Sequence, residues 1–455
     1  MSNYKARICL ATPSNAAVDE LAKRIIRFNK KCEHNKLDVI KLVRIGNSDS
    51  INSEVRPFHL EALVERHGRT DAQKNVPDSV RKELTYVIKR IDSLNKNIKD
   101  PKTSKAQQSV DKSELDDLWK QRQNLEAEGG HRLTARQRYR SQCAVLDNAH
   151  VVCGTLSSLG HETVQQILLR KEKHRHRDQT FSVLIIDEAT QAIEMDCLIP
   201  LQFKVNKLVL VGDHQQLPAT VISQKACELR LDRSLFERLH TWFKVLCQDE
   251  ADCEPPLMTL REQYRMHPDI LKLPNFYFYQ NKLATAQCIE NRPFFLKPYL
   301  VFDIEEGVET QGHIDSHKSY SNPVEASCIA KLCEIVLNVY AATCGGTRES
   351  YQSRIGVICP YSDQKRRIID NLRKSKIQEV VVNTVDSFQG QEKDVIIMSC
   401  VRAQSNPTSI GFVENKKRMN VALTRAKFAM YVVGNFVETL KQVVRLSHAC
   451  ALCHQ

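Results

Sequence analysis

Short runs of consecutive apolar residues, each closed by polar or small residues, constrain the fold of this chain more than any other feature. The runs are Ala6–Ala11, Leu42–Ile45, Val151–Gly154, Val183–Asp187, Leu208–Asp213, Ile355–Pro360, Val395–Val401 and Ala429–Gly434. Runs of this length are typical of central strands that are buried on both faces of a parallel sheet. Helical patterns lie between them, over Ala16–Phe28, Asp363–Lys374 and Lys417–Lys427. Strands that alternate with helices predict βαβ units and an α/β fold.

The runs form two series, one before about Leu260 and one after about Ser321, which indicates two α/β domains. We place them at residues 1–260 and 261–455, a division that suits a chain of 455 residues. Between Glu54 and Gln142 the strand-like runs vanish, and Leu and Ile recur at helical spacing. We therefore expect a helical insertion at about 54–142 in the first domain. It is basic, and both a solvated helix pair and a nucleic-acid contact remain open for it.

Composition excludes several classes of protein. The 66 Lys and Arg exceed the 54 Asp and Glu, for a net charge of +12, which favours a polyanionic partner without naming one. No apolar run approaches the roughly 18 residues that cross a bilayer, so we expect a soluble intracellular protein and no membrane partner. The 16 cysteines are scattered singly, as free thiols are in a reducing compartment. The terminal Cys450–His454 segment has CxxCH spacing, and whether it binds metal stays open.

Two adjacent carboxylates, Asp187 and Glu188, follow the buried run that begins at Val183. The carboxyl edge of a parallel sheet is where open α/β folds bind ligands. A carboxylate there can hold Mg²⁺, and its neighbour can orient a water that attacks a γ-phosphate. An Asp-Glu pair after a strand is also common in sites without catalysis.

A second polar loop follows the next run, over Gly212–Pro218. Gly212 permits a tight turn, and the Gln216 amide can donate to a phosphate oxygen while it accepts from water. A plain turn at a strand end is the alternative. Two loops of matched chemistry at neighbouring strands favour a common site.

Further motifs make the pattern specific. They are Pro13–Leu21, Ile51–Val55, Leu217–Ser223, Gln263–Pro268, Asn383–Asp394 and Asn420–Lys427. With the Asp187 and Gln216 loops, in this order, the chain resembles the superfamily 1 helicases of the up-frameshift branch. The resemblance spans nearly all of the chain except the insertion and the last twenty or so residues. It implies two RecA-like domains that use ATP and Mg²⁺, with ATP bound between them.

The resemblance also implies roles for single residues at the nucleotide. In the first domain, Asp187 would serve Mg²⁺ and Glu188 would position or deprotonate the hydrolytic water. Gln216 would contact the γ-phosphate. The second domain would supply Tyr264 to stack on the adenine, Arg265 and Arg425 to reach the γ-phosphate, and Gly390 and Glu392 beside the nucleotide, with Glu392 on its ribose.

Nucleic-acid contacts are expected at two places. Pro13, Ser14 and Asn15 follow a strand and open a helix, so hydroxyl, amide and backbone N–H groups suit a phosphate. Capping of that helix by Ser14 is the simpler alternative. The resemblance adds four residues of the second domain, Asn383, Thr384, Ser387 and Gln389. Contacts to phosphate and sugar predict salt-sensitive binding of single strands without sequence preference.

The resemblance implies 5′-to-3′ translocation on RNA or RNA–DNA hybrids, with roles in transcription termination and R-loop removal in the nucleus. The cytoplasm, a DNA substrate, and transcription or RNA-processing proteins as partners stay open. The family's Gly-Lys-Thr/Ser phosphate loop is absent, since no GxxxxGK[ST] occurs in these residues. We therefore expect a first domain truncated at its N-terminus, with weak ATP turnover. A catalytically silent nucleic-acid-binding adaptor is the alternative.

Overall fold

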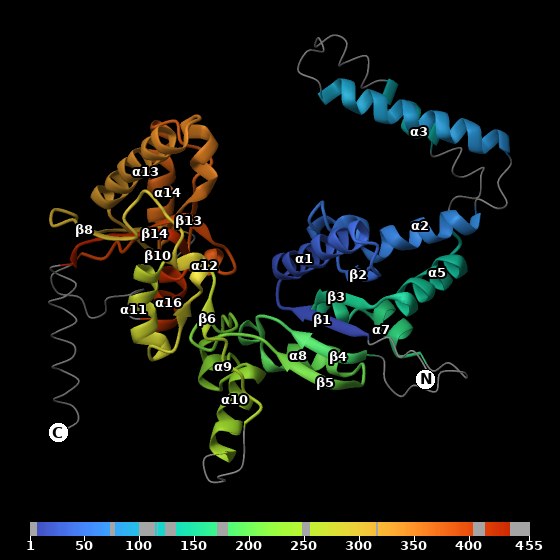
Figure 1. Cartoon of the computed structure of the whole chain (residues 1–455), viewed down its shortest axis with the longest axis horizontal. Helices are drawn as coiled ribbons and strands as arrows, with labels where there is room; N and C mark the ends of the chain where they lie inside the picture. Colours follow the sequence, from blue (N-terminus) through green and yellow to red (C-terminus); the bar gives the residue numbers. More distant parts are fainter. Residues whose placement is uncertain are drawn as a thin grey trace. The chain divides into compact units, whose positions relative to one another are not determined.

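The computed structural model describes residues 7–72, 78–99, 114–115, 117–122, 133–170, 181–247, 255–314, 317–403 and 415–436 (Figure 1). The chain separates into two compact units. The first comprises Met1–Gly212 and Val221–Phe236, and the second comprises Asp213–Thr220 and Glu237–Gln455. The bounds 1–260, 261–455 and 54–142 stay a prediction.

The first unit is built on a five-stranded parallel sheet in the order β2-β3-β1-β4-β5. Its strands are β1 (Ile8–Thr12), β2 (Leu42–Ile45), β3 (Val151–Thr155), β4 (Phe181–Ile186) and β5 (Val205–Leu210). Its helices outside the insertion are α1 (Asn15–His34), α6 (Leu156–Leu159), α7 (Glu162–Leu168), α8 (Glu194–Leu201) and α9 (Gln224–Glu228). The next helix, α10 (Leu235–Leu246), belongs to the second unit from Glu237 onward. Ile8 lies opposite Val151 on one side and Val183 on the other, which makes β1 a central strand.

The strand β5 departs from the expectation of a strand buried on both faces. Leu208, Val209 and Leu210 are only half-buried, and Val211 beyond them is 40% exposed. The physical reason is position, because β5 pairs with β4 alone and forms an edge of the sheet.

The described residues of the insertion are mostly helical. Between β2 and β3 the described residues form α2 (Leu60–Ala72), α3 (Asp78–Lys99), α5 (Ala135–Asn148) and the short turns η1 (Ser48–Ser50) and η2 (Arg56–Phe58), with no strand among them. Val87 and Ile91 of α3 are buried against Leu115 and Leu118. A capping box at Thr134 opens α5, as its Thr-x-x-Gln sequence predicts.

The second unit holds another five-stranded parallel sheet, in the order β12-β11-β13-β14-β8. Its strands are β8 (Tyr299–Asp303), β11 (Ile355–Ile358), β12 (Val381–Asn383), β13 (Lys393–Ser399) and β14 (Ala426–Gly434), and two smaller pairs join β6 (Glu262–Gln263) to β7 (Ala284–Thr285) and β9 (Thr310–Ile314) to β10 (His317–Ser321). The helices are α11 (Pro268–Tyr279), α12 (Gln287–Glu290), α13 (Pro323–Cys344), α14 (Ser362–Lys374), α15 (Val385–Phe388) and α16 (Lys416–Leu423), with the turn η4 (Arg348–Arg354). Two parallel sheets with helices confirm the predicted α/β class.

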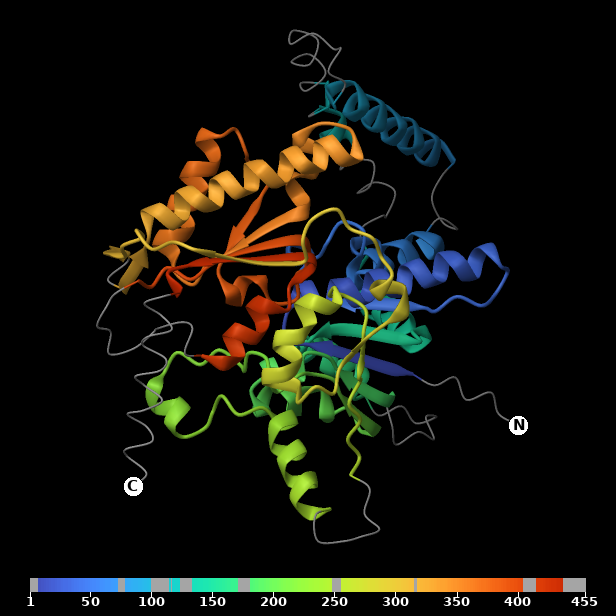
Figure 2. The same ribbon diagram turned by 60° about the vertical axis from the view of Figure 1, so that its left-hand side comes forward.

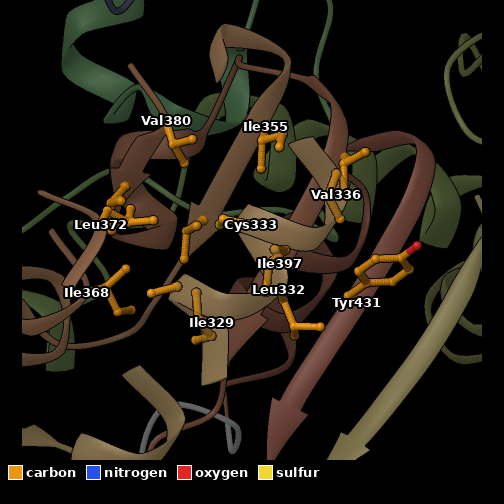
Figure 3. Close-up of a cluster of buried hydrophobic side chains, with 14 of the residues drawn as sticks. Ile329, Leu332, Cys333, Val336, Ile355, Ile368, Leu372, Val380, Ile397 and Tyr431 are labelled. Atoms are coloured by element: carbon orange, nitrogen blue, oxygen red, sulfur yellow. The ribbon is translucent and has the colours of Figure 1, made fainter. Parts of the chain in front are cut away.

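Helices cover both faces of the second sheet. On one face, Ile329, Cys333 and Val336 of α13 pack against Ile355 and Ile397 of the sheet (Figure 3), and α13 is seen lying along this face in Figure 2. The residues next to Ile397 along β13, Ile396 and Met398, belong to the cluster on the other face, which α11, α15 and α16 complete. This burial on both faces explains why the strands read as uninterrupted apolar runs.

One helix of this core, α13, is long and apolar enough to cross a membrane by length and composition, although its sequence contains no uninterrupted apolar run of that length. Nine of its residues are buried in the second unit, among them Ile329, Cys333 and Val336. A core helix passes the same test of length and hydropathy, and the packing of α13 is that of a core helix.

The cysteines largely follow expectation. Cys9 and Cys153 are buried free thiols in strands of the first sheet, and Cys359 and Cys400 are buried free thiols that directly follow β11 and β13. Cys247 is disulfide-bonded, so the prediction of free thiols throughout is wrong at that position. The terminal CxxCH segment lies outside the described residues.

Candidate functional site

The two carboxylates of the first unit lie where β4 ends. The Asp187 N–H donates to Ala11 O at 2.9 Å and extends the ladder beyond the strand. Asp187 Oδ1 accepts from the Glu188 N–H at 3.0 Å, and Glu188 adopts a left-handed conformation with φ 54°. Gln191 Nε2 donates to Glu188 Oε2 at 2.5 Å. The strained backbone of Glu188 is thus held by a local hydrogen bond, as is common at functional sites.

The two loops that follow β4 and β5 are joined to each other. Ala189 N donates to Val211 O at 2.8 Å. A Cβ on Gly212 would meet the Thr190 side chain at 3.1 Å and its backbone nitrogen at 3.2 Å. Gly212 therefore favours close approach to the carboxylate loop, where a larger residue would press on Thr190, whereas the sequence suggested a tight turn.

The Asp187 carboxylate fits Mg²⁺ by its chemistry. Among the described residues no group of three or more His, Cys, Asp or Glu side chains could hold a metal. Mg²⁺ at nucleotide sites commonly takes one or two carboxylates and completes its shell with water and phosphate oxygens. A half-buried carboxylate at a sheet's carboxyl end is a donor of that kind.

The nucleic-acid candidates of the first unit open α1. Ser14 caps the helix by accepting from the Ala17 N–H at 3.2 Å, as its capping alternative predicted. Thr12 Oγ1 donates to Ser14 O at 2.7 Å and shapes the turn that contains Pro13. Asn15 Oδ1 accepts from the buried Arg44 at 2.8 Å.

The Gln216 loop belongs to the second unit, where it meets Arg425. Arg425 Nη2 donates to Gln216 Oε1 at 3.2 Å, and Gln216 Nε2 donates to Asp213 Oδ2 at 2.9 Å. Arg425 is only 2% exposed, and its Nε donates to Val421 O at 2.9 Å. Arg425 lies in the turn between α16 and β14. The helix predicted over 417–427 ends at Leu423, so the prediction was wrong for its last turn.

Arg265 lies in the same neighbourhood. Its Nη1 donates to Thr424 O at 3.0 Å, and its Nε donates to Glu392 Oε2 at 2.7 Å. Burial works to raise the pKa of Glu392, but hydrogen bonds from Lys427 and Arg265 outweigh it and hold that pKa low. Glu392 is therefore an anion between two cations in this structure.

Tyr264 stands apart from this network with 64% of its surface exposed, and its hydroxyl donates to Glu262 Oε2 at 2.5 Å. The turn beneath it is fixed by Gln263, whose Oε1 accepts from the backbone N–H groups of Arg265 and Met266. An exposed ring on a fixed turn is suited to stack on a planar base.

The other second-unit candidates surround α15. Lys365 Nζ donates to Asn383 Oδ1 at 2.7 Å, and Thr384 Oγ1 lies 3.1 Å from Ser387 Oγ. The buried Gln389 Nε2 has no hydrogen-bond partner among the described residues. Gly390 follows with φ +77°, a conformation that favours glycine.

Sequence reasoning missed three members of the second-unit network. Tyr279 OH donates to Asp213 Oδ2 at 2.6 Å, and Asn420 Nδ2 donates to Tyr279 OH at 2.7 Å and to Gln215 O at 3.1 Å. Burial, followed by the Asp213 charge, raises the pKa of Tyr279. Asp213 and Asn420 stood inside quoted motifs, whereas Tyr279 had no signal beyond its place in an aromatic helix.

Comparison with known proteins agrees with the motif series. Two family models, both described as AAA domain, match residues 1–224 and 231–437. The human protein named probable helicase senataxin is 34% identical over 448 residues, which are 94% of this chain and 16% of that protein. Helicase sen1 of Schizosaccharomyces pombe is 33% identical over 465 residues, 96% of this chain and 26% of that protein. The chain belongs to the superfamily 1 helicases, up-frameshift branch.

This superfamily 1 chain spans a sixth to a quarter of the length of those two relatives. A solved structure, arterivirus nonstructural protein 10 (helicase) with DNA, aligns with a TM-score of 0.34 and 10% identity over 94% of this chain and 54% of that one. That score is too low to establish a shared fold.

Proposed function

We propose that this chain is the motor core of an ATP-dependent helicase that moves 5′ to 3′ on RNA or RNA–DNA hybrids. By likeness to the senataxin and sen1 proteins, we assign it to transcription termination and R-loop removal in the nucleus. The observation that carries the proposal is the hydrogen bond from Arg425 to Gln216 inside the second unit. It joins a fixed guanidinium charge to an amide of the kind that senses a γ-phosphate.

The nucleotide chemistry divides among residues with different properties. Glu188 would orient and accept a proton from the attacking water, and Asp187 would hold Mg²⁺, which supplies charge neutralisation at the phosphates. Arg425 and Arg265 would stabilise the charge that develops on the transferred phosphoryl group. Tyr264 would stack on the adenine, while Gly390 and Glu392 would lie along the ribose. Glu392 would exchange part of its contact with Arg265 for a ribose hydroxyl.

Single-strand binding draws on polar groups at helix starts. Ser14 and Asn15 lie at the N-terminus of the 20-residue α1, where backbone N–H groups and the helix dipole favour a phosphate. Asn383, Thr384, Ser387 and Gln389 would add backbone contacts in the second unit. None of these groups reads a base edge, so binding would be independent of sequence and weakened by salt.

The test is Arg425→Ala in a form of the protein that carries a Gly-Lys-Thr/Ser phosphate loop. We expect nucleic-acid-stimulated ATP turnover to fall by about 10³-fold, the scale of a lost arginine finger, while strand affinity stays within about twofold. Arg373→Ala is the matched control, because Arg373 is a 70% exposed arginine on α14. Turnover that survives Arg425→Ala would refute the role of Arg425.

A second candidate function, a catalytically silent nucleic-acid-binding adaptor, is favoured by the absence of a GxxxxGK[ST] motif from residues 1–455. An adaptor of this kind would bind nucleic acid through the same surfaces without ATP turnover. The two are separated by unwinding assays on RNA–DNA hybrids and DNA duplexes, which also test the DNA-processing alternative. Strand binding without unwinding of either substrate by the loop-carrying form would support the silent adaptor.

A further inference from the structure

A fully buried arginine lies behind the first-unit strand-binding residues. Arg44 occupies β2, has no exposed surface, and is flanked by the buried Val43 and Ile45. Its Nε donates to Asp19 Oδ1 at 3.0 Å, its Nη2 donates to Asn15 Oδ1 at 2.8 Å, and its Nη1 donates to Ile45 O. An arginine is rarely buried so completely unless it is paired, because removing its charge from water costs several kcal/mol.

The guanidinium group contacts two successive turns of α1. Asn15 and Asp19 are four residues apart and therefore share one face of the helix. Asp19 also fixes the chain beyond β2, since its Oδ2 accepts from the Asn52 N–H at 2.8 Å. Arg44 thus anchors the start of α1 to the buried strand β2.

This contact decides which way the Asn15 amide points. Arginine has only donors, so the amide must turn its oxygen toward Arg44. The two N–H donors of Asn15 are then directed away from Arg44, at the N-terminal end of α1. Ser14 adds one further donor there, because its hydroxyl oxygen accepts from the Ala17 N–H while its O–H can still donate.

We propose that Arg44 is a positioning residue for strand binding: it orients the Asn15 amide so that its N–H groups donate to a backbone phosphate. The inference rests on the proposed function, since it deepens the role of Asn15 in that site. Arg44 itself touches no nucleic acid and adds no charge to the surface. Its contribution is the lower entropy cost of an amide that is already oriented.

The first test removes the N–H donors of the Asn15 side chain while it keeps the oxygen that accepts from Arg44. Asn15→Asp keeps an oxygen for Arg44 but removes the donors, so we expect a thermal midpoint no lower than that of the natural protein and an affinity reduced about tenfold or more. The probe is a fluorescently labelled oligouridylate of about 20 nucleotides, followed by anisotropy at low salt, where phosphate contacts are strongest. Asn35→Asp, at the exposed C-terminal end of α1, adds the same charge and should leave affinity unchanged.

The second test is a double-mutant cycle of Arg44→Lys and Asn15→Ala. Arg44→Lys keeps a cation beside Asp19 and loses the forked contact to Asn15, and we expect about three- to tenfold weaker binding. In the Asn15→Ala background the same change should leave affinity unaltered, although it still lowers the thermal midpoint. A merely structural role would weaken binding equally in both backgrounds and would overturn the inference.

Different results would refute the proposed strand binding and the positioning role of Arg44. Absence of oligouridylate binding by the natural chain would overturn the proposed strand binding and this inference with it. Binding that Asn15→Asp leaves intact would overturn the inference alone. The Asn15→Asp result decides the matter even if Arg44→Lys does not fold.

Discussion

Buried charges in this protein are each held by several partners. Glu325, at the start of α13, is fully buried and accepts from Ser399 Oγ at 2.7 Å and from the Val401 N–H at 2.9 Å. Glu309 similarly accepts from Arg402 Nε at 2.9 Å. Because an unpaired buried charge is so costly, such residues are sensitive points at which a single substitution or a pH change acts.

The Glu325 carboxyl gives the second unit a pH dependence. Burial raises its pKa to about 7, against the opposing hydrogen bonds from Ser399 and Val401, whereas an unfolded glutamate titrates near pH ~4.3. The folded state therefore binds the extra proton. The stability this confers is fully present below pH ~4.3 and is lost as the pH rises through about 7, a change of up to about 3 kcal/mol.

The quantity to measure is the thermal midpoint of the natural protein minus that of Glu325→Gln. We expect this difference to decrease as the pH rises from 5 to 8, and the contributions of other titrating groups cancel in it. Glu334→Gln, which changes a carboxylate of the same helix that pairs with Lys331, is the control. A constant difference between the natural protein and Glu325→Gln over this range would contradict the prediction.

The Tyr279 hydroxyl is the second sensitive point. Tyr279→Phe removes one donor to Asp213 and one acceptor for Asn420, whose Oδ1 already has no partner among the described residues. We expect the second unit to lose about 1–3 kcal/mol of unfolding free energy in urea. Tyr277 lies on the same helix and is 69% exposed, so Tyr277→Phe should cost less than about 0.5 kcal/mol of unfolding free energy. Equal effects of the two variants would refute the assignment.

At the scale of elements, the apolar runs predicted strands well. Each of the eight runs overlaps one of β1 to β5, β11, β13 and β14, although the run Leu208–Asp213 shares only its first half with β5. Strands at the edges of the second sheet escaped prediction: β8 and β12 are less buried than the central strands, and each has a short apolar stretch that ends in Asp303 or Asn383. The end of α16 was also missed, since Arg425 to Lys427 continue a helical charge pattern while the chain turns into β14.

The candidate site residues differ in how strongly the sequence indicates them. Residues that we propose to contact a ligand carry motif signals in the sequence, whereas residues that act through another side chain do not. Arg44 did carry a signal: a charged residue inside a buried run must find partners. No sequence pattern shows that its partners are Asp19 and Asn15, because that depends on how α1 packs across β2.

The helix α13 offers a prediction at this scale. Val336 is 2% exposed and packs against the second sheet, while its neighbour Ile335 is 49% exposed. Val336→Asp would bury an unpaired carboxylate and should cost at least about 3 kcal/mol, or prevent folding. Ile335→Asp should change stability by less than about 0.5 kcal/mol in the same denaturation assay. If both variants were tolerated, α13 would not be a core helix.

At the scale of the whole molecule, nucleotide binding is the property most open to test. Residues 1–455 contain no GxxxxGK[ST] segment, so the backbone N–H groups and the lysine that bind β- and γ-phosphates in the family are not supplied by it. We expect the purified chain to bind ATP weakly and to hydrolyse it slowly or not at all, in a phosphate-release assay with single-stranded RNA. Robust RNA-stimulated turnover would show that other residues supply the phosphate contacts.

The loop Asp213–Thr220 makes the chain leave the first unit and return to it before Glu237. Cutting the polypeptide at a single point therefore cannot yield both units whole. A fragment that starts at Glu237 would hold Arg425 without Gln216, and Tyr279 without Asp213. Instability of such a fragment would reflect the missing eight-residue loop Asp213–Thr220, and dissection of this protein calls for that peptide to be added back.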